Sequence, residues 1–142
     1  MKNKLLLLGV LGLVPFMTAC GGGNSSDNQL LCTMNSGVGT TSYYFDFDKD
    51  DKLTGGHIEE YVVYEEAACG DEDECETFIE NALDGCKKSP DYNSCKISKQ
   101  DSKSATITAN FEKSSLDEAG ISVGTSKADV KSAAESHGFK CK

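Results

Sequence analysis

Residues 40–64 read TTSYYFDFDKDDKLTGGHIEEYVVY and carry the clearest structural pattern in the chain. Tyr43, Phe45 and Phe47 alternate with mostly polar residues. This period of two is typical of a strand with one apolar face. The polar sequence KDDK then reverses the chain, and the residues after it are again extended, with a bulge or bend expected at Gly55-Gly56. We therefore predict a long β-hairpin over the whole segment.

Three further segments are expected to be strands. Residues 30–35 read LLCTMN and form a short strand before the hairpin. Residues 94–99 and 104–112 flank a polar turn at residues 100–103, so they are predicted to form a second hairpin. In the later of these strands, apolar and polar side chains alternate through the sequence ATITANF.

Two helices follow from residue spacing and from end signals. Residues 73–86 place apolar side chains every three or four positions, which makes one apolar stripe, with acidic residues at its start and lysines after its end. Ser126 is expected to start the last helix, because Asp129 three residues later completes a capping-box-like pair. Gly138 is placed as the residue that ends this helix. A short helical turn is expected at residues 116–119.

The order of these elements predicts the fold class. Short connections between strands require antiparallel pairing, and two amphipathic helices need an apolar surface to cover. We therefore expect an α+β fold: an antiparallel β-sheet built from two hairpins, with two helices packed on one face. Residues 30–142 are expected to form this single domain, stapled by disulfides.

The first twenty residues, MKNKLLLLGVLGLVPFMTAC, have the pattern of an export signal. Their apolar run, residues 5–17, is shorter than the roughly 20 residues of a membrane-spanning helix. The ending MTAC resembles the lipobox of bacterial lipoproteins, a family in which the cysteine takes a diacylglyceryl lipid and becomes the first residue after cleavage. We therefore expect residues 1–19 to be a signal peptide, Cys20 to be lipidated and residues 20–29 to be a flexible tether. The alternative is an ordinary signal peptide with an incidental cysteine.

The charge of the chain limits its partners. It has 14 lysines, no arginine and 23 acidic residues. Without residues 1–19, 12 lysines remain against 23 acidic residues, a net charge of −11. Such a chain is a poor ligand for nucleic acids and for anionic lipid headgroups. We expect a monomer that is held at the cell membrane through the lipid on Cys20, exposed outside the cytoplasm, and that binds no nucleic acid.

The cysteine count supports an exported protein. Seven cysteines stand at positions 20, 32, 69, 75, 86, 95 and 141. Without the lipidated cysteine six remain, and an even number in an exported chain indicates three disulfides. Free thiols and a zinc site are the alternatives. The spacing lacks the close cysteine pairs of structural zinc sites, so we favour disulfides.

Six cysteines can pair in many ways, and spacing excludes few of them. Cys75 and Cys86 cannot pair with each other, because the eleven residues of helix between them place them roughly 16 Å apart. Of the remaining arrangements we favour Cys32–Cys141, Cys69–Cys75 and Cys86–Cys95.

A calcium-binding loop is one candidate site. Asp46, Asp48 and Asp50 resemble the opening of an EF-hand loop, which requires glycine at its sixth position and glutamate at its twelfth. The chain has Asp51 and His57 at these positions. We therefore interpret the segment as a solvated turn and expect neither a metal nor another cofactor.

Residues 59–76 form an acidic run that contains no lysine. This run could be a docking surface for a basic partner, a loose cation site or a solvated face. Its nine acidic residues are Glu59, Glu60, Glu65, Glu66, Asp71, Glu72, Asp73, Glu74 and Glu76.

No catalytic constellation is visible in the sequence. His57 and His137 are the two histidines, and neither has a nucleophile as a sequence neighbour. Motifs for nucleophilic, metal-dependent or nucleotide-dependent catalysis are absent, so we expect no catalytic residue. Four tyrosines of the first hairpin either line a ligand face or are ordinary sheet aromatics: Tyr43, Tyr44, Tyr61 and Tyr64.

The chain resembles the YehR-like family of small bacterial lipoproteins. The shared features are the lipobox, the early hairpin at residues 40–64, the later strand ATITANFEK and the closing helix KADVKSAAESHGFKCK with its GFK-type ending. The six further cysteines and the acidic loop at residues 65–95 depart from the family pattern. The resemblance implies an α+β sheet-and-helix fold and no assigned activity.

From these observations we expect a non-enzymatic binding or interaction module displayed on the cell envelope. One alternative is a ligand-binding accessory subunit of an envelope system that uses the sheet face near Tyr61 and Tyr64. A hydrolase with an unrecognised site is the other alternative. An interaction module predicts an exposed apolar patch, whereas a ligand binder predicts an enclosed site with a few polar groups.

Overall fold

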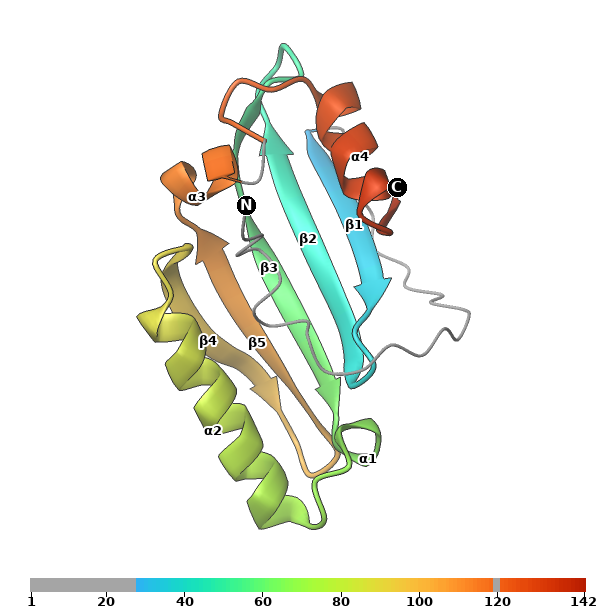
Figure 1. Ribbon diagram of the computed structural model, residues 1–142, viewed down its shortest axis with the longest axis vertical. Coiled ribbons are helices and arrows are strands. Elements are labelled where there is room, and N and C mark those ends of the chain that lie inside the picture. The colour runs from blue at the N-terminus through green and yellow to red at the C-terminus, as the bar shows by residue number, and fades with distance from the viewer. Residues whose placement is uncertain (1–27, 119–120) are drawn as a thin grey trace.

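The computed structural model describes residues 28–118 and 121–142 (Figure 1). The predicted signal peptide, Cys20 and the tether as far as residue 27 lie outside the described residues. In chain order the elements are β1 (Gln29–Asn35), β2 (Gly39–Phe47), β3 (Leu53–Val63), α1 (Tyr64–Ala67), α2 (Glu72–Lys88), β4 (Tyr92–Gln100), β5 (Ser104–Phe111), α3 (Lys113–Glu118), α4 (Lys127–Ser136) and β6 (Lys140–Cys141).

The strands form one sheet in the order β4-β5-β3-β2-β1-β6, and every pairing between neighbours is antiparallel. The predicted α+β class with an antiparallel sheet is therefore confirmed. The sheet is larger than the two predicted hairpins, which correspond to β2–β3 and β4–β5. Strand β1 pairs along its whole length with β2, and β6 adds two residues to the far edge of β1.

One face of the sheet is buried under helices. Cys32, Tyr43, Ile58 and Ala109 are paired in succession across β1, β2, β3 and β5, so their side chains share this face. They are buried in one cluster with Val130 of α4 and with other residues of α2 and α4. Figure 1 shows α2 and α4 on the same side of the sheet, at its two flanks. We call this side the helix-bearing face.

The glycine pair of the first hairpin lies where the strand register changes. Asp46 pairs with Gly55, but the next residue of β2, Phe47, pairs with Leu53. Thr54 is therefore the extra residue of a β-bulge, which confirms the predicted irregularity. A Cβ atom on Gly56 would lie closer than 3.0 Å to the carbonyl oxygen of Tyr44, so this position requires glycine.

Both long helices begin at the expected kind of cap. The Asp71 side chain accepts a hydrogen bond from the backbone N–H of Glu74, and further acidic residues in the first turn of α2 suit the positive end of the helix dipole. Ser126 accepts from the backbone N–H of Asp129, as predicted for α4. The helix predicted at residues 73–86 lies within α2.

Three disulfides hold these elements together. Cys32–Cys141 joins β1 to β6, Cys69–Cys75 closes the loop before α2 onto its first turn, and Cys86–Cys95 joins the end of α2 to β4. These are the three favoured pairs, and the prediction is confirmed.

Tyr64 is the clearest error of the strand prediction. The extended pattern placed it in the second strand of the hairpin, but it begins the four-residue helix α1 and is buried at 6% exposure. Its backbone N–H donates to the carbonyl of Lys103 in the turn between β4 and β5, and its hydroxyl accepts from Gln100. Helix α1 was not predicted, because four residues are too few to show a helical period.

Candidate functional site

Glu60 is a carboxylate on the helix-bearing face. It lies on β3 between Ile58 and Val62, two buried residues that point to the same side of the sheet. Its direct neighbours across the sheet are Thr41 on β2 and Ile107 on β5. Only 3% of Glu60 is exposed, which is unusual for glutamate because a buried charge requires a compensating partner.

Glu60 has two hydroxyl neighbours. Thr41 Oγ1 donates to Glu60 Oε2 at 2.5 Å. The Ser36 hydroxyl also acts on the Glu60 carboxyl as a hydrogen-bonding neighbour, and in the described part of the chain neither Ser36 Oγ nor Glu60 Oε1 has another partner. Both hydroxyls therefore serve this carboxyl group, as the burial of polar groups requires.

The electrostatics agree with this geometry. Burial raises the pKa of Glu60, while the hydroxyls of Thr41 and Ser36 act in the opposite direction. Burial also raises the pKa of Tyr92 to about 12, and the charges of Asp91 and Glu60 add to the effect. The pKa of Tyr43 is likewise raised, first by burial and then by Tyr92 and Glu60. Both phenols therefore lie within electrostatic reach of the carboxylate.

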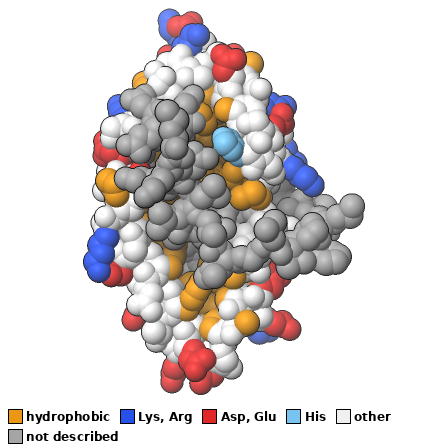
Figure 2. Space-filling view, viewed as in Figure 1, with side chains coloured by type: hydrophobic (Ala, Val, Ile, Leu, Met, Phe, Trp, Pro, Cys, Tyr) orange, Lys and Arg blue, Asp and Glu red, His pale blue; other side chains and the backbone are white. Residues whose placement is uncertain are grey.

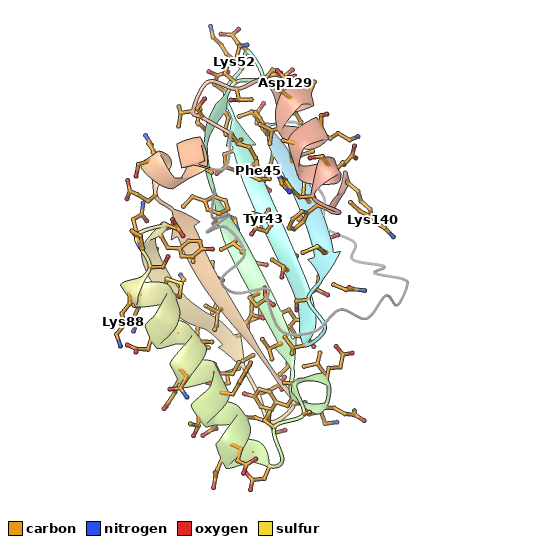
Figure 3. All side chains as sticks on the ribbon, viewed as in Figure 1. Tyr43, Phe45, Lys52, Lys88, Asp129 and Lys140 are labelled. Carbon is orange, nitrogen blue, oxygen red and sulfur yellow. A yellow bond between two sulfur atoms is a disulfide. The ribbon has the colours of Figure 1, made fainter. Side chains whose placement is uncertain are left out.

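A group of aromatic rings lies on the same face of the sheet as Glu60. Tyr43 packs edge-to-face against Phe139 with ring centroids 4.8 Å apart, and it stacks with Phe111 at 5.6 Å. Tyr92 also stacks on Phe111, with ring centroids 6.2 Å apart. Figure 3 shows Tyr43 on the helix-bearing face between α2 and α4. We define the Glu60 site as Ser36, Thr41 and Glu60.

The Glu60 site has the composition of a small-ligand site. A few buried polar groups lie among buried apolar residues of the same face, which is a combination also found where hydrogen bonds orient a ligand. Figure 2 shows hydrophobic side chains along the middle of this face. What the site can do chemically is accept hydrogen bonds or hold a positive charge.

The four tyrosines proposed as one ligand face are divided between the two faces of the sheet. Tyr43 and Tyr64 are buried, whereas Tyr61 on the opposite face is 43% exposed. Tyr44 also lies on that face, where its ring stacks on His57 with centroids 4.5 Å apart. The alternative ligand face near Tyr61 and Tyr64 is therefore wrong as a single surface, because β3 ends between these residues and the chain turns into α1.

The two histidines lie in separate elements, His57 in β3 and His137 at the end of α4. His57 Nε2 lies 3.9 Å from Glu59 Oε1, and the Tyr44 hydroxyl donates to Glu59 Oε2 at 3.3 Å. His137 is exposed at the C-cap of α4, where its backbone N–H donates to the carbonyl of Ala134.

The acidic run is not one surface. Glu59 and Glu60 point to opposite faces of β3, and Glu60 is buried. Glu65 and Glu66 lie in α1, and the remaining acidic residues surround the start of α2. Figure 2 shows acidic side chains gathered at this end of the molecule. The predicted docking surface at residues 59–76 therefore loses its first two members.

Two of the three aspartates of the calcium hypothesis, Asp46 and Asp48, accept hydrogen bonds through their side chains. Asp48 Oδ1 accepts from the backbone N–H groups of Asp50 and Lys52, which is the polar turn that the sequence suggested. Asp46 accepts a hydrogen bond from the side chain of Gln29. Gln29 is the first residue of β1, so this strand begins within the predicted tether of residues 20–29. Among residues 28–118 and 121–142, no three His, Cys, Asp or Glu side chains are grouped to hold a metal ion.

The sequence analysis missed the buried position of Glu60, because Glu60 is one of the nine acidic residues of the run at residues 59–76. A usable signal was present in its position. Glu60 has the same parity as Ile58 and Val62, the apolar residues of this strand. An acid at an inward position of a strand is a stronger sign of a site than an acid in a charged loop.

In the described part of the chain, no helix is both long enough and apolar enough to cross a membrane. The chain matches no protein-family model, no curated protein and no solved structure.

Proposed function

We propose that this protein is a lipid-anchored lipoprotein of the cell envelope whose domain binds a ligand at the Glu60 site and catalyses no reaction. One observation supports the binding role above all others. Glu60 is buried on an apolar face, where its polar neighbours are the hydroxyls of Thr41 and Ser36 and none of the ion pairs in the described residues includes it. A buried carboxylate of this kind destabilises a fold, so its presence is best explained by a ligand that completes its interactions.

Sequence and structure both support the lipid anchor at Cys20. The lipobox-like sequence MTAC ends at this residue. The other six cysteines are paired with one another, so none of them is available to form a disulfide with Cys20 in the same chain. Disulfides also suit an exported protein, because they form and persist in oxidising compartments.

The resemblance to the YehR-like family supports the same proposal. The resemblance rests on the lipobox, the hairpin at residues 40–64 and the closing helix. In the structure, the hairpin contains the strand pair β2–β3 and the closing helix is α4. A family without an assigned activity is consistent with a binding role. The proposed ligand-binding accessory subunit of an envelope system differs from a general binding module only in its partner, and the Glu60 site serves both.

Replacing Cys20 by serine is expected to release the protein from the membrane. Serine lacks the thiol that takes the diacylglyceryl group, and the lipid chains are the proposed anchor. The three disulfides should form unchanged. Cell fractionation followed by immunoblotting measures the distribution, and non-reducing electrophoresis checks the disulfides.

The matched control is Ser26→Ala in the same tether, which should remain with the membrane. If Cys20→Ser protein sediments with membranes as completely as this control, the proposed anchor is wrong.

Replacing Glu60 by glutamine is expected to raise the free energy of unfolding at pH 7 by about 1–3 kcal/mol. The neutral side chain can still accept from Thr41, and its amide can donate to Ser36, so the buried charge is lost without a new unpaired group. Sites built for binding commonly gain stability when their charged residue is neutralised. Urea denaturation of both proteins measures the difference.

The pH dependence provides a check on the cause. Because burial raises the pKa of Glu60, its contribution to stability is complete below its ordinary pKa and is lost as pH rises through the raised value. The advantage of Glu60→Gln should therefore shrink as pH falls from 7 toward 4. The phenols of Tyr43 and Tyr92, whose pKa values are raised, stay protonated in this range. Glu59→Gln, on the exposed face of the same strand, should show neither effect.

A thermal-denaturation screen tests ligand binding directly. Small cations, neutral compounds and anions are added separately to wild-type protein, Glu60→Gln and Glu59→Gln. We expect at least one compound to raise the melting temperature of wild-type and Glu59→Gln protein but not that of Glu60→Gln. A ligand that binds only the folded state stabilises by about 2.7 kcal/mol at a hundredfold excess over its dissociation constant. If every compound acts equally on all three proteins, the binding proposal fails.

A further inference from the structure

We propose that the outer edge of β4 binds an extended polypeptide segment as an added β-strand, and that two acidic side chains of this segment pair with Lys96 and Lys99. This interaction surface is separate from the Glu60 site, and the inference does not depend on what that site binds.

Strand β4 is the last strand at one end of the sheet. In the described part of the chain β5 is its only strand neighbour, and six of its nine residues are exposed (Figure 1). Such a strand has N–H and C=O groups that point away from the sheet and can pair with another strand. The side-chain hydrogen bonds of β4 that join it to β5 run the other way, because Ser94 and Ser98 accept from Asn110 and Thr108.

Helix α2 lies over one face of β4 and leaves this outer edge open. Cys95 and Ile97 pair with Ala109 and Ile107, two buried residues of the helix-bearing face. Cys95 is bonded to Cys86 of α2, and Ile97 is half-buried. An added strand would therefore continue the sheet beside β4, and an apolar side chain on its helix-bearing side would cover more of Ile97.

The edge strand is positively charged in an acidic chain. It has two lysines and no acidic residue, whereas the whole chain has a net charge of −9. Lys96 and Lys99 pair with Thr108 and Thr106, so both lie on the face opposite the helices. Because these threonines are two positions apart on β5, the two lysines are separated by roughly 7 Å along the strand. Both lysines are exposed, and in the described residues neither belongs to an ion pair.

This spacing specifies the chemistry of the partner. Residues i and i+2 of a strand lie on one face about 7 Å apart, so acidic residues at these positions would meet both lysines. A second copy of β4 would bring two lysines and no acidic residue, and like charges on neighbouring strands destabilise their pairing. Main-chain hydrogen bonds would supply the affinity, and the alternate side chains would supply the specificity.

The test uses three fluorescent peptides with one residue for each of the nine residues of β4: TVTVEVEVT, TVTVKVKVT and TVTPEPEVT. The third keeps both acidic residues, but its prolines lack the N–H groups that strand pairing requires. The full chain, expressed in cells and purified in detergent, is titrated with each peptide and followed by fluorescence anisotropy. The variants are Lys96→Glu with Lys99→Glu, and a control of equal charge change, Lys49→Glu with Lys52→Glu in the β2–β3 turn.

We expect TVTVEVEVT to bind the wild-type and control proteins alike, and to bind the edge variant about tenfold more weakly. Two exposed ion pairs become two like-charge contacts in that variant. The edge variant should instead prefer TVTVKVKVT, which also shows that it is folded. The proline peptide should bind none of the three proteins.

Three results would overturn the inference. Equal binding of TVTPEPEVT and TVTVEVEVT would show attraction of a negative charge without strand addition. Equal binding of TVTVEVEVT to the edge variant and to the control, or to neither of them nor wild-type protein, would exclude this edge. A dimer detected by analytical ultracentrifugation and dissociated by TVTVEVEVT would make a second copy the natural occupant. Binding at the Glu60 site is measured separately and is decided by none of these results.

Discussion

Replacing Cys32 and Cys141 together by alanine is expected to lower the free energy of unfolding by about 5 kcal/mol. Their disulfide closes a loop with a sequence separation of 109 residues, so it restricts the unfolded chain more than any shorter loop does. It also holds the two-residue strand β6 against β1, where few other hydrogen bonds secure the end of the chain. Denaturant unfolding under oxidising conditions measures the loss.

The disulfide between Cys69 and Cys75 provides the matched comparison. Its sequence separation is 6 residues, and the same relation gives about 2 kcal/mol for its removal. Both double variants keep the remaining two disulfides. If removing Cys69–Cys75 destabilises the protein as much as removing Cys32–Cys141, loop length is not the source of the stabilisation, and strain or lost packing must account for it.

Replacing Gly56 by alanine is expected to destabilise the fold by about 3 kcal/mol or more. The added Cβ would lie closer than 3.0 Å to the carbonyl oxygen of Tyr44 on the paired strand, and both atoms belong to backbone that cannot rotate away. Strands β2 and β3 would have to separate at the centre of the sheet. Urea denaturation monitored by circular dichroism gives the change.

The neighbouring glycine provides an unusually close control. A Cβ atom on Gly55 would meet no atom within 4 Å, so Gly55→Ala should change stability by less than about 1 kcal/mol and in the stabilising direction. The two variants differ by one position in the same strand. Equal losses of stability in both would show that the bulge itself, and not the approach of the strands at Gly56, requires glycine.

Much of the fold could be predicted because local and tertiary requirements agree in these segments. The alternating aromatics of Tyr43, Phe45 and Phe47 are all buried on the helix-bearing face. The capping residues of α2 and α4 act where the sequence placed acidic and hydroxyl side chains. The helical separation of Cys75 and Cys86 excludes their pairing with each other, and the three pairs that we favoured among the remaining arrangements are the ones that form.

The errors have physical reasons of two kinds. Tyr64 suits a strand by its own preference, but the pairing of β3 with β5 ends at Val63 and Ser104, so the chain turns into α1. Glu60 was missed because an acidic run in a sequence is read as solvated surface, whereas pairing with Thr41 fixes this one carboxylate on the buried face. The surroundings of Glu60 come from β2, β3 and β5 and from Ser36 after β1, and no local pattern specifies them.

The position of Gln29 has a consequence for how the protein would stand on a bilayer. Strand β1 begins at the end of the sheet that carries the β2–β3 turn and Lys52, and α1 and the start of α2 lie at the opposite end (Figures 1 and 3). If Cys20 carries the proposed lipid, the short segment between Cys20 and β1 would hold the first of these ends near the headgroups. The acidic end would then point away from the anionic lipid surface, in the direction that other envelope components approach.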